Sequence, residues 1–91
     1  MKANSITVFN FIKDNDGKNF TAADIAEATG LSAKSVNGII TKGLQYKDDD
    51  GNVVALAERV PAELELADGT HKAVKFIRLT EAGKGYTPVE E

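Results

Sequence analysis

The chain has 91 residues, a formal net charge of −3 and no cysteine, which fits one small domain and excludes disulfides and thiolate zinc sites. It begins with no signal-peptide pattern and contains no apolar run long enough to cross a membrane, so we expect a cytoplasmic protein without membrane contacts. We expect one folded domain over residues 1–86 and a flexible acidic tail over residues 87–91.

The first predicted element is a helix from Ser5 to Asn15, capped by Asn4 or Ser5. Apolar residues recur along it at helical spacing and predict a face that packs into the core. These residues are Ile6, Val8, Phe9, Phe11 and Ile12. Turn-forming residues 14–17 are expected to end the helix. Residues 18–20 could add a brief edge to a sheet, and Phe20 is expected to pack against the start of the next helix.

Two helices joined by a tight turn are predicted between Thr21 and Leu44. The Thr21 hydroxyl can cap the first helix, and Asp24 places negative charge where it suits a helix start. Gly30 can adopt the left-handed conformation that ends a helix, and Ser32 can cap the second helix. The segment is therefore expected to form two helices around a sharp corner.

The second helix of this pair, residues 32–43, is expected to have two distinct faces. Val36, Ile39 and Ile40 lie at the spacing of a buried stripe. The residues predicted to be exposed are polar, basic or small, and they are Lys34, Ser35, Asn37, Gly38, Thr41 and Lys42. This exposed face is the first candidate binding surface.

The segment resembles the helix-turn-helix motif of DNA-binding regulators. The matching residues are a small residue at the helix crossing, a glycine in the turn and apolar anchors, namely Ala26, Gly30, Leu31, Val36 and Ile39. The resemblance implies that residues 32–43 lie in the major groove of double-stranded DNA, with the lysines on phosphates and Asn37 on an adenine edge. Gly38 would then permit close approach to the DNA backbone or mark a helix crossing. The alternative is a plain helical hairpin that packs against something else.

An acidic segment follows, with the sequence KDDDGN over residues 47–52. It offers alternating oxygen ligands but lacks the glycine and final glutamate spacing of a hand-type calcium loop. We therefore expect a solvated loop. Residues 53–57 are ambiguous between a short strand and a helical turn, and we favour a strand.

Residues 53–66 and 70–79 are the two long strand candidates. The Asp68–Gly69 pair between them predicts a two-residue hairpin turn. That register would place Glu65 opposite Lys72 and Val60 opposite Ile77, so that an acid meets a base and aliphatic residues meet each other.

The first of these strands alternates between apolar and polar residues, which predicts a sheet with one buried face. Val60, Ala62 and Leu64 would lie on that face, and Pro61 indicates an edge strand or a bulge because it cannot donate a hydrogen bond. At the tip, Thr70, His71 and Lys72 either reach a DNA minor groove or phosphates, or belong to a solvated turn.

The order of elements resembles a winged helix-turn-helix domain, an α+β fold in which a three-helix core is followed by a β-hairpin wing. Residues 76–84 resemble the strand exit of MarR-like regulators, with Thr80 capping a last helical turn that Gly83 ends. The whole is also similar to small winged-helix proteins of phage and Gram-positive bacteria. The long dimerising helices of MarR-like regulators are missing, and residues 44–59 are longer and more acidic than a simple wing entry. We therefore expect a monomer, with a homodimer as the alternative.

Charge is divided unevenly along the chain: residues 1–47 hold six lysines and four acidic residues, whereas residues 48–91 hold five basic and ten acidic residues. His71 is the single histidine, and no serine has a base beside it in the sequence, so neither an enzyme nor a cofactor is expected. Two hypotheses remain. One is a DNA-binding transcriptional regulator of phage or prophage type, and the other is a winged-helix module that binds a protein partner through its acidic second half.

Overall fold

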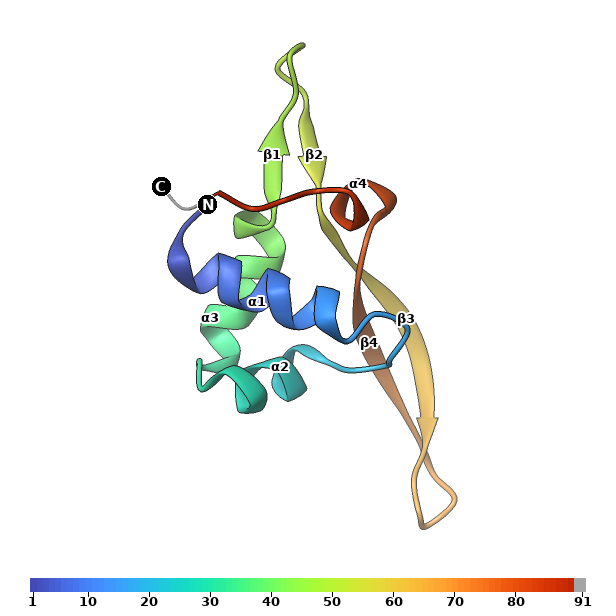
Figure 1. Ribbon diagram of the computed structural model, residues 1–91. Coiled ribbons are helices and arrows are strands. Elements are labelled where there is room, and N and C mark those ends of the chain that lie inside the picture. The colour runs from blue at the N-terminus through green and yellow to red at the C-terminus, as the bar shows by residue number, and fades with distance from the viewer. Residues whose placement is uncertain (90–91) are drawn as a thin grey trace.

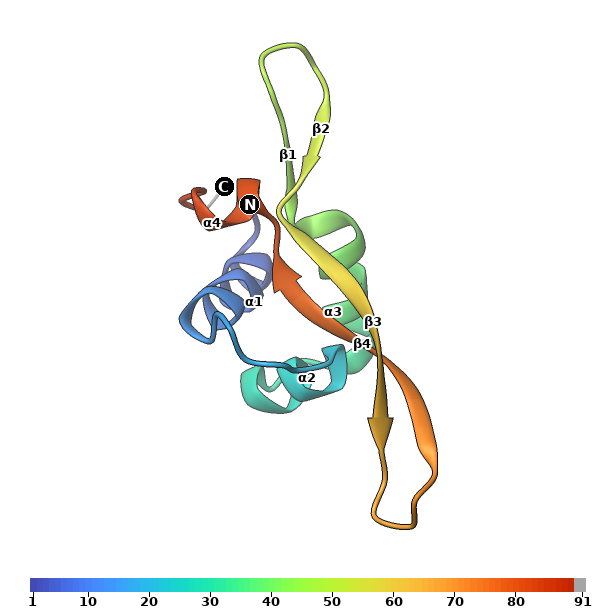
Figure 2. The ribbon, with the colours of Figure 1, turned by 90° about the vertical axis from the view of Figure 1, so that its right-hand side faces the viewer.

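Two β-hairpins project from opposite ends of a helical core in the computed structural model, which describes residues 1–89 (Figures 1 and 2). The helices are α1 (Ala3–Asp14), α2 (Ala22–Thr29), α3 (Ala33–Gly38), the π-helical η1 (Ile39–Gly43) and α4 (Glu81–Lys84). The antiparallel strand pairs are β1 (Gln45–Lys47) with β2 (Val53–Ala55), the first hairpin, and β3 (Ala57–Glu65) with β4 (His71–Leu79), the second hairpin. The molecule is an elongated α+β fold that measures 50 × 26 × 21 Å.

Helix α1 begins earlier than the sequence indicates. Lys2 is its N-cap residue and provides no side-chain cap, so the predicted capping by Asn4 or Ser5 is wrong. Ser5 instead lies inside the first turn and is buried, with 6% of its surface exposed. The predicted end of the helix is confirmed, because Asn15 is the C-cap and Gly17 turns the chain with a φ of +85°.

Local capping chemistry defines α2 and α3 as predicted. The Thr21 hydroxyl accepts from the Asp24 amide at 3.3 Å while the Asp24 carboxylate accepts from the Thr21 amide at 2.9 Å, a reciprocal capping box. Gly30 ends α2 in the left-handed conformation, with a φ of +76°. The Ser32 hydroxyl accepts from the Ser35 amide at 3.1 Å and starts α3.

The predicted second helix is helical over its full length but changes its winding. After Gly38 it becomes η1, where the Leu44 amide donates to the Ile39 carbonyl oxygen at 2.9 Å, five residues back. The wider turn brings Gly43 against α1, where a Cβ on Gly43 would lie 2.7 Å from the Ser5 hydroxyl. It also places Leu44 in the core.

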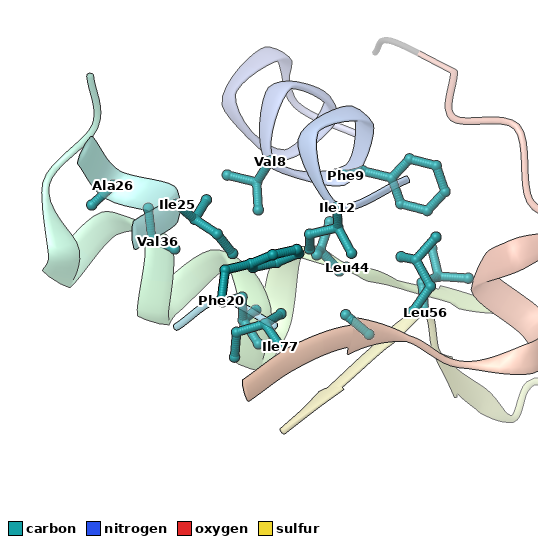
Figure 3. Close-up of a cluster of buried hydrophobic side chains, with 13 residues drawn as sticks. Val8, Phe9, Ile12, Phe20, Ile25, Ala26, Val36, Leu44, Leu56 and Ile77 are labelled. Carbon is teal, nitrogen blue, oxygen red and sulfur yellow. The ribbon is translucent and has the colours of Figure 1, made fainter. Parts of the chain in front are cut away.

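The hydrophobic core lies between the three main helices and the base of the second hairpin (Figure 3). Its buried residues come from every element except the first hairpin and α4, and they are Val8, Phe9, Ile12, Phe20, Ile25, Ala26, Val36, Ile40, Leu44, Leu56, Ala57, Ile77 and Leu79. Phe20 packs edge to face on Phe11, with ring centroids 5.3 Å apart. Its carbonyl oxygen accepts from the Ile77 amide at 2.9 Å, so the brief sheet edge expected near residue 20 amounts to one backbone hydrogen bond.

The second hairpin forms with a different turn and register from those predicted. The Leu66 amide donates to the Thr70 carbonyl at 2.7 Å, and the Gly69 amide donates to the Leu66 carbonyl at 2.9 Å. Three residues, not two, therefore connect the strands, with Gly69 left-handed at a φ of +85°. The register shifts by one residue, so that Glu65 pairs with His71 and Val60 with Phe76.

This one-residue shift corrects the predicted buried face. Ala57, Ile77 and Leu79 face the core, and the period of two places all odd-numbered strand residues on that side. Val60, Ala62 and Leu64 lie on the opposite face, and none of them is buried. The prediction that Pro61 lies in an edge strand is confirmed, because β3 has only β4 beside it within residues 1–89.

The first hairpin was not predicted, because its strands have three residues each and its turn is the acidic segment expected to be a loop. The preference for a strand after residue 52 is confirmed over Val53–Ala55. Tyr46 at its base stacks on Tyr86 with centroids 5.3 Å apart, and Tyr86 meets Phe9 edge to face at 5.9 Å. Both tyrosines are thus packing residues.

Leu56 joins the two hairpins. Its amide donates to the Leu44 carbonyl at 2.9 Å in the first hairpin, and its carbonyl accepts from the Thr80 amide at 3.0 Å beside the second. Thr80 caps α4 as predicted, but Gly83 does not end that helix, which continues to Lys84. Gly83 is a glycine because a Cβ there would clash with the Leu56 carbonyl oxygen.

The end of the described chain lies beside its beginning. The amino group of Met1 donates to the Val89 carbonyl oxygen at 2.8 Å. Part of the predicted tail, residues 90–91, lies outside the described residues, so its flexibility stays a prediction. No helix within residues 1–89 is both long enough and apolar enough to span a membrane.

Candidate nucleic-acid interface

The six residues predicted for the exposed face of the second helix are all exposed along α3 and η1. They are Lys34, Ser35, Asn37, Gly38, Thr41 and Lys42, and below we call them the helix face. Burial of Val36 and Ile40 on the other side of the helix fixes this orientation. The helix face is bordered by a cleft on each side.

The first cleft, called the N-terminal cleft below, separates the start of α1 from α3 and η1. It has a volume of about 680 Å³ and is lined by residues 1–5 together with Ser35, Gly38, Ile39, Lys42 and Gly43. Three members of the helix face therefore border it. Lys2 and Lys42 are its basic residues, and no carboxylate lines it within the described chain.

The second cleft, called the hairpin cleft below, lies between the start of α2, α3 and the second hairpin, and has a volume of about 520 Å³. It is lined by residues 21–23, Asn37, Arg59, Pro61, Ala62, residues 72–75 and Ile77. Its charged residues are Arg59, Lys72 and Lys75. Here too the described residues contribute no carboxylate to the lining.

Arg59 connects the second hairpin to the helix face and was missed in the sequence. Its Nη2 donates to the Asn37 carbonyl at 3.2 Å and to the Thr41 hydroxyl at 3.0 Å. The predicted buried face of Val60, Ala62 and Leu64 implied that Arg59 points away from the helices, so no signal in the sequence placed it beside α3. This contact links the second hairpin to α3.

The three residues predicted to contact DNA at the hairpin tip, Thr70, His71 and Lys72, lie in different surroundings. Thr70 belongs to the turn, where its amide and hydroxyl both donate to Asp68 Oδ1, at 3.0 and 2.6 Å. These two donors lower the pKa of Asp68 below its ordinary value of 3.8, so the carboxylate at the tip is ionised.

His71 and Lys72 point to different surroundings. His71 Nδ1 lies 3.6 Å from Glu63 Oε1, a diagonal contact that the predicted register did not contain. The predicted pairing of Glu65 with Lys72 is wrong, because Lys72 lies opposite Leu64. Of the three predicted wing residues, Lys72 is the one that lines the hairpin cleft.

Gly38 has an open environment. A Cβ built on it would meet nothing within 4 Å, so packing between helices does not require glycine at this position. Of the two reasons offered for Gly38 by the sequence, the helix crossing is thus excluded. The residue instead leaves a gap on the helix face at the border of the N-terminal cleft.

No cluster of His, Cys, Asp or Glu side chains within residues 1–89 could hold a metal ion. Comparison of the chain with protein-family models, curated proteins and solved structures finds no match. The candidate interface is therefore defined by geometry and charge. It comprises the helix face and the two clefts that border it.

Proposed function

We propose that this protein is a winged-helix DNA-binding protein, a transcriptional regulator that inserts α3 and η1 into the major groove. In this proposal the second hairpin is the wing, and the bond from Ile77 to Phe20 ties it to the helical core. The MarR-like resemblance of residues 76–84 is consistent with this assignment. The first hairpin is then an insertion between the helix-turn-helix segment and the wing.

One observation carries the proposal: basic residues and carboxylates are segregated around the helix face. The clefts on its two sides are lined by Lys2, Lys42, Arg59, Lys72 and Lys75, and no described carboxylate lines either of them. The chain as a whole has a net charge of −3, so this separation is opposite to its average composition. Neutralisation of phosphates by lysine and arginine supplies most non-specific affinity for DNA.

The roles of the side chains follow from their positions. Lys34 and Lys42 lie at opposite ends of the helix face, where they can contact phosphates on the two sides of a major groove. Asn37 is exposed between them, and its amide has the donor and acceptor needed to read an adenine edge once Oδ1 releases the 3.5 Å hydrogen bond that Arg59 Nη2 donates to it. Lys72 and Lys75 would meet the backbone beside the wing.

Salt-dependent binding of a fluorescein-labelled random duplex, followed by anisotropy, tests the proposal. Affinity should fall steeply between about 50 and 200 mM salt. The double variant Lys34→Ala/Lys42→Ala should reduce the slope of log K against log salt concentration by about 2. The matched control Lys13→Ala/Lys47→Ala removes equal charge from residues that line neither cleft, and it should keep the slope of the parent protein. Absence of duplex binding at low salt would overturn the proposal.

A second candidate function, binding of a protein partner, is favoured by the outer face of the second hairpin. Val60 pairs with Phe76 and Ala62 with Val74 across the strands; all four are half-buried and none is packed against the core, although Ala62 and Val74 also border the hairpin cleft. Together with the acidic second half of the chain, this face suits a basic partner with apolar groups. In that case duplex DNA would not bind, and Phe76→Ser would abolish partner binding while the helix-face variants would not.

A further inference from the structure

We propose that the N-terminal cleft is a phosphate-binding site, built from the uncapped start of α1, Ser5 and the lysines on either side. If the ligand is a phosphate of the DNA backbone, the site rests on the proposed function. If the ligand is a free phosphate group, the site is independent of that function.

The first turn of α1 presents unpaired hydrogen-bond donors to the cleft. The first intrahelical bond runs from the Ile6 amide to the Lys2 carbonyl at 3.0 Å, and no described residue accepts from the amides of residues 3–5. Lys2 provides no side-chain cap. Three amides and the positive end of a 12-residue helix therefore converge on the cleft, an arrangement that attracts anions.

Ser5 adds a side-chain donor to the site, independently of the helix start. The residue is 6% exposed, yet its hydroxyl has no hydrogen-bond partner among the described residues. The described chain contains no fully sealed side-chain polar atom without a partner, so this hydroxyl opens onto the cleft that Ser5 lines. The hydroxyl of this otherwise buried residue is thus left free to donate to a ligand in the cleft.

The donor set selects the class of ligand. Amides, ammonium groups and a hydroxyl surround the cleft, and no carboxylate lines it within residues 1–89. A phosphate group has several acceptor oxygens and a negative charge, so it can accept from the α1 amides, Ser5 and Lys42 at once. Because Ser35, Gly38 and Lys42 belong both to the cleft and to the helix face, a DNA strand beside α3 would place a backbone phosphate here.

The glycines make room for this group. Gly43 lets η1 approach Ser5, and Gly38 leaves the wall of the cleft open, with nothing within 4 Å of a Cβ built there. An alanine at position 38 fits the helical backbone of that residue, whose φ and ψ are −62° and −41°. It would therefore fill space without disturbing the fold.

Titration of the ¹⁵N-labelled protein with inorganic phosphate tests the site, with sodium chloride at matched ionic strength as the reference. We expect saturable shifts of the amide resonances of residues 3–5, and about tenfold weaker binding in Ser5→Ala, the loss of one charge-assisted hydrogen bond. Ser5→Ala should fold normally because the hydroxyl it removes has no protein partner. Lys42→Ala is a second test of the same site, at an exposed residue whose replacement should not disturb the fold. Lys13→Ala, which removes the same charge outside the cleft, is its control.

A duplex DNA titration of the same variants distinguishes the two sources of phosphate. If Ser5→Ala weakens duplex binding by a similar factor, the ligand is the DNA backbone. If phosphate shifts residues 3–5 but Ser5→Ala leaves duplex affinity unchanged, or no duplex binds, the site takes a free phosphate group and the backbone assignment is overturned. Phosphate that fails to shift residues 3–5, or shifts them equally in Ser5→Ala, overturns the site itself even where DNA binds.

Discussion

The two hairpins have turns with the same backbone hydrogen-bond pattern but strands of very different length. In the first hairpin the Asp48 amide donates to the Asn52 carbonyl at 2.9 Å, and the Gly51 amide donates to the Asp48 carbonyl at 3.0 Å. The second hairpin has the same two hydrogen bonds, from Leu66 to Thr70 at 2.7 Å and from Gly69 to Leu66 at 2.9 Å. Each contains an Asp-Gly pair whose glycine is left-handed, with φ of +83° at Gly51 and +85° at Gly69. The same backbone turn thus connects a pair of three-residue strands in one case and of nine-residue strands in the other.

The difference teaches that burial, not the turn, sets the length of these strands. The second hairpin contributes Ala57, Ile77 and Leu79 to the core, and these anchors support pairing far beyond the helices. The first hairpin has no buried residue within its strands and is held at its base by Tyr46. An isolated hairpin is marginally stable in water, so each hairpin extends only as far as its anchored base supports it.

The largest effect is expected where the hairpins meet. Gly83→Ala forces a Cβ into the Leu56 carbonyl, the group that bonds the second hairpin at the joint between the two. We expect a loss of about 3 kcal/mol or more in the free energy of unfolding, measured by urea denaturation. Gly85→Ala is the matched control, since a Cβ there meets nothing within 4 Å. Equal stability of the two variants would show that the hairpins do not depend on this joint.

The next effect is on the affinity for duplex DNA, which we expect to depend on the second hairpin and not on the first. Lys72→Ala/Lys75→Ala should weaken binding to duplex DNA about tenfold near 0.1 M salt, because both residues line the hairpin cleft. Asp49→Ser/Asp50→Ser changes two charges at the tip of the first hairpin, on the opposite end of the molecule (Figure 1). Charges farther than about 10 Å are screened at this salt concentration, so affinity should change less than about twofold. A large gain of affinity there would place the first hairpin in the interface.

A smaller effect separates the two turns by their coupling to the core. Alanine in the left-handed region costs roughly 1 to 2 kcal/mol, and neither Gly51 nor Gly69 has an atom within 4 Å of a built Cβ, so the cost is conformational in both. Gly69→Ala should lower the free energy of unfolding by that amount. Gly51→Ala should lower it less, because the first hairpin can open locally without exposing the core. Equal losses in urea denaturation would indicate that both hairpins unfold together with the helices.

The smallest effect is the pH dependence contributed by Asp68. The Thr70 hydroxyl and amide lower the pKa of Asp68 in the folded state, so its contribution to stability is present above the ordinary pKa of 3.8 and is lost as the pH falls through the lower folded-state pKa. Asp68→Asn should therefore flatten the decline of the urea midpoint in that acidic range. Asp49→Asn, on the other hairpin, is the control, and a matching change in it would show that the Thr70 contacts are not the cause.

Local signals predicted the helices well because caps and turns act over a few residues. The capping box at Thr21, the left-handed Gly30 and the Ser32 cap all depend on neighbours within four positions, and all are present in the structure. The start of α1 was misplaced because helix starts at Lys2 and at Ser5 are equally compatible with the apolar spacing. The π-helical η1 was missed because the same stripe of Val36, Ile39 and Ile40 fits either winding.

Pairing across the second hairpin was harder, because Asp-Gly occurs in both two-residue and three-residue turns. The shift by one residue exchanged the two faces of the ribbon and moved Arg59 toward α3. Of the candidate site, the exposure of all six helix-face residues followed from periodicity. Lys2, Ser5, Arg59 and Lys75 could not be added from the sequence, since tertiary contacts alone bring them to the clefts.

The hydrogen bond between the Met1 amino group and the Val89 carbonyl has a consequence for chain connectivity. A short linker that replaces residues 90–91 could join residue 89 to residue 1 across this contact and close the backbone into a ring. New ends opened between Asp49 and Asp50 would then give a permuted chain that runs from β2 through the second hairpin and α1 to β1. The helix face and both clefts would be retained in this permutant, since the acidic turn borders none of them.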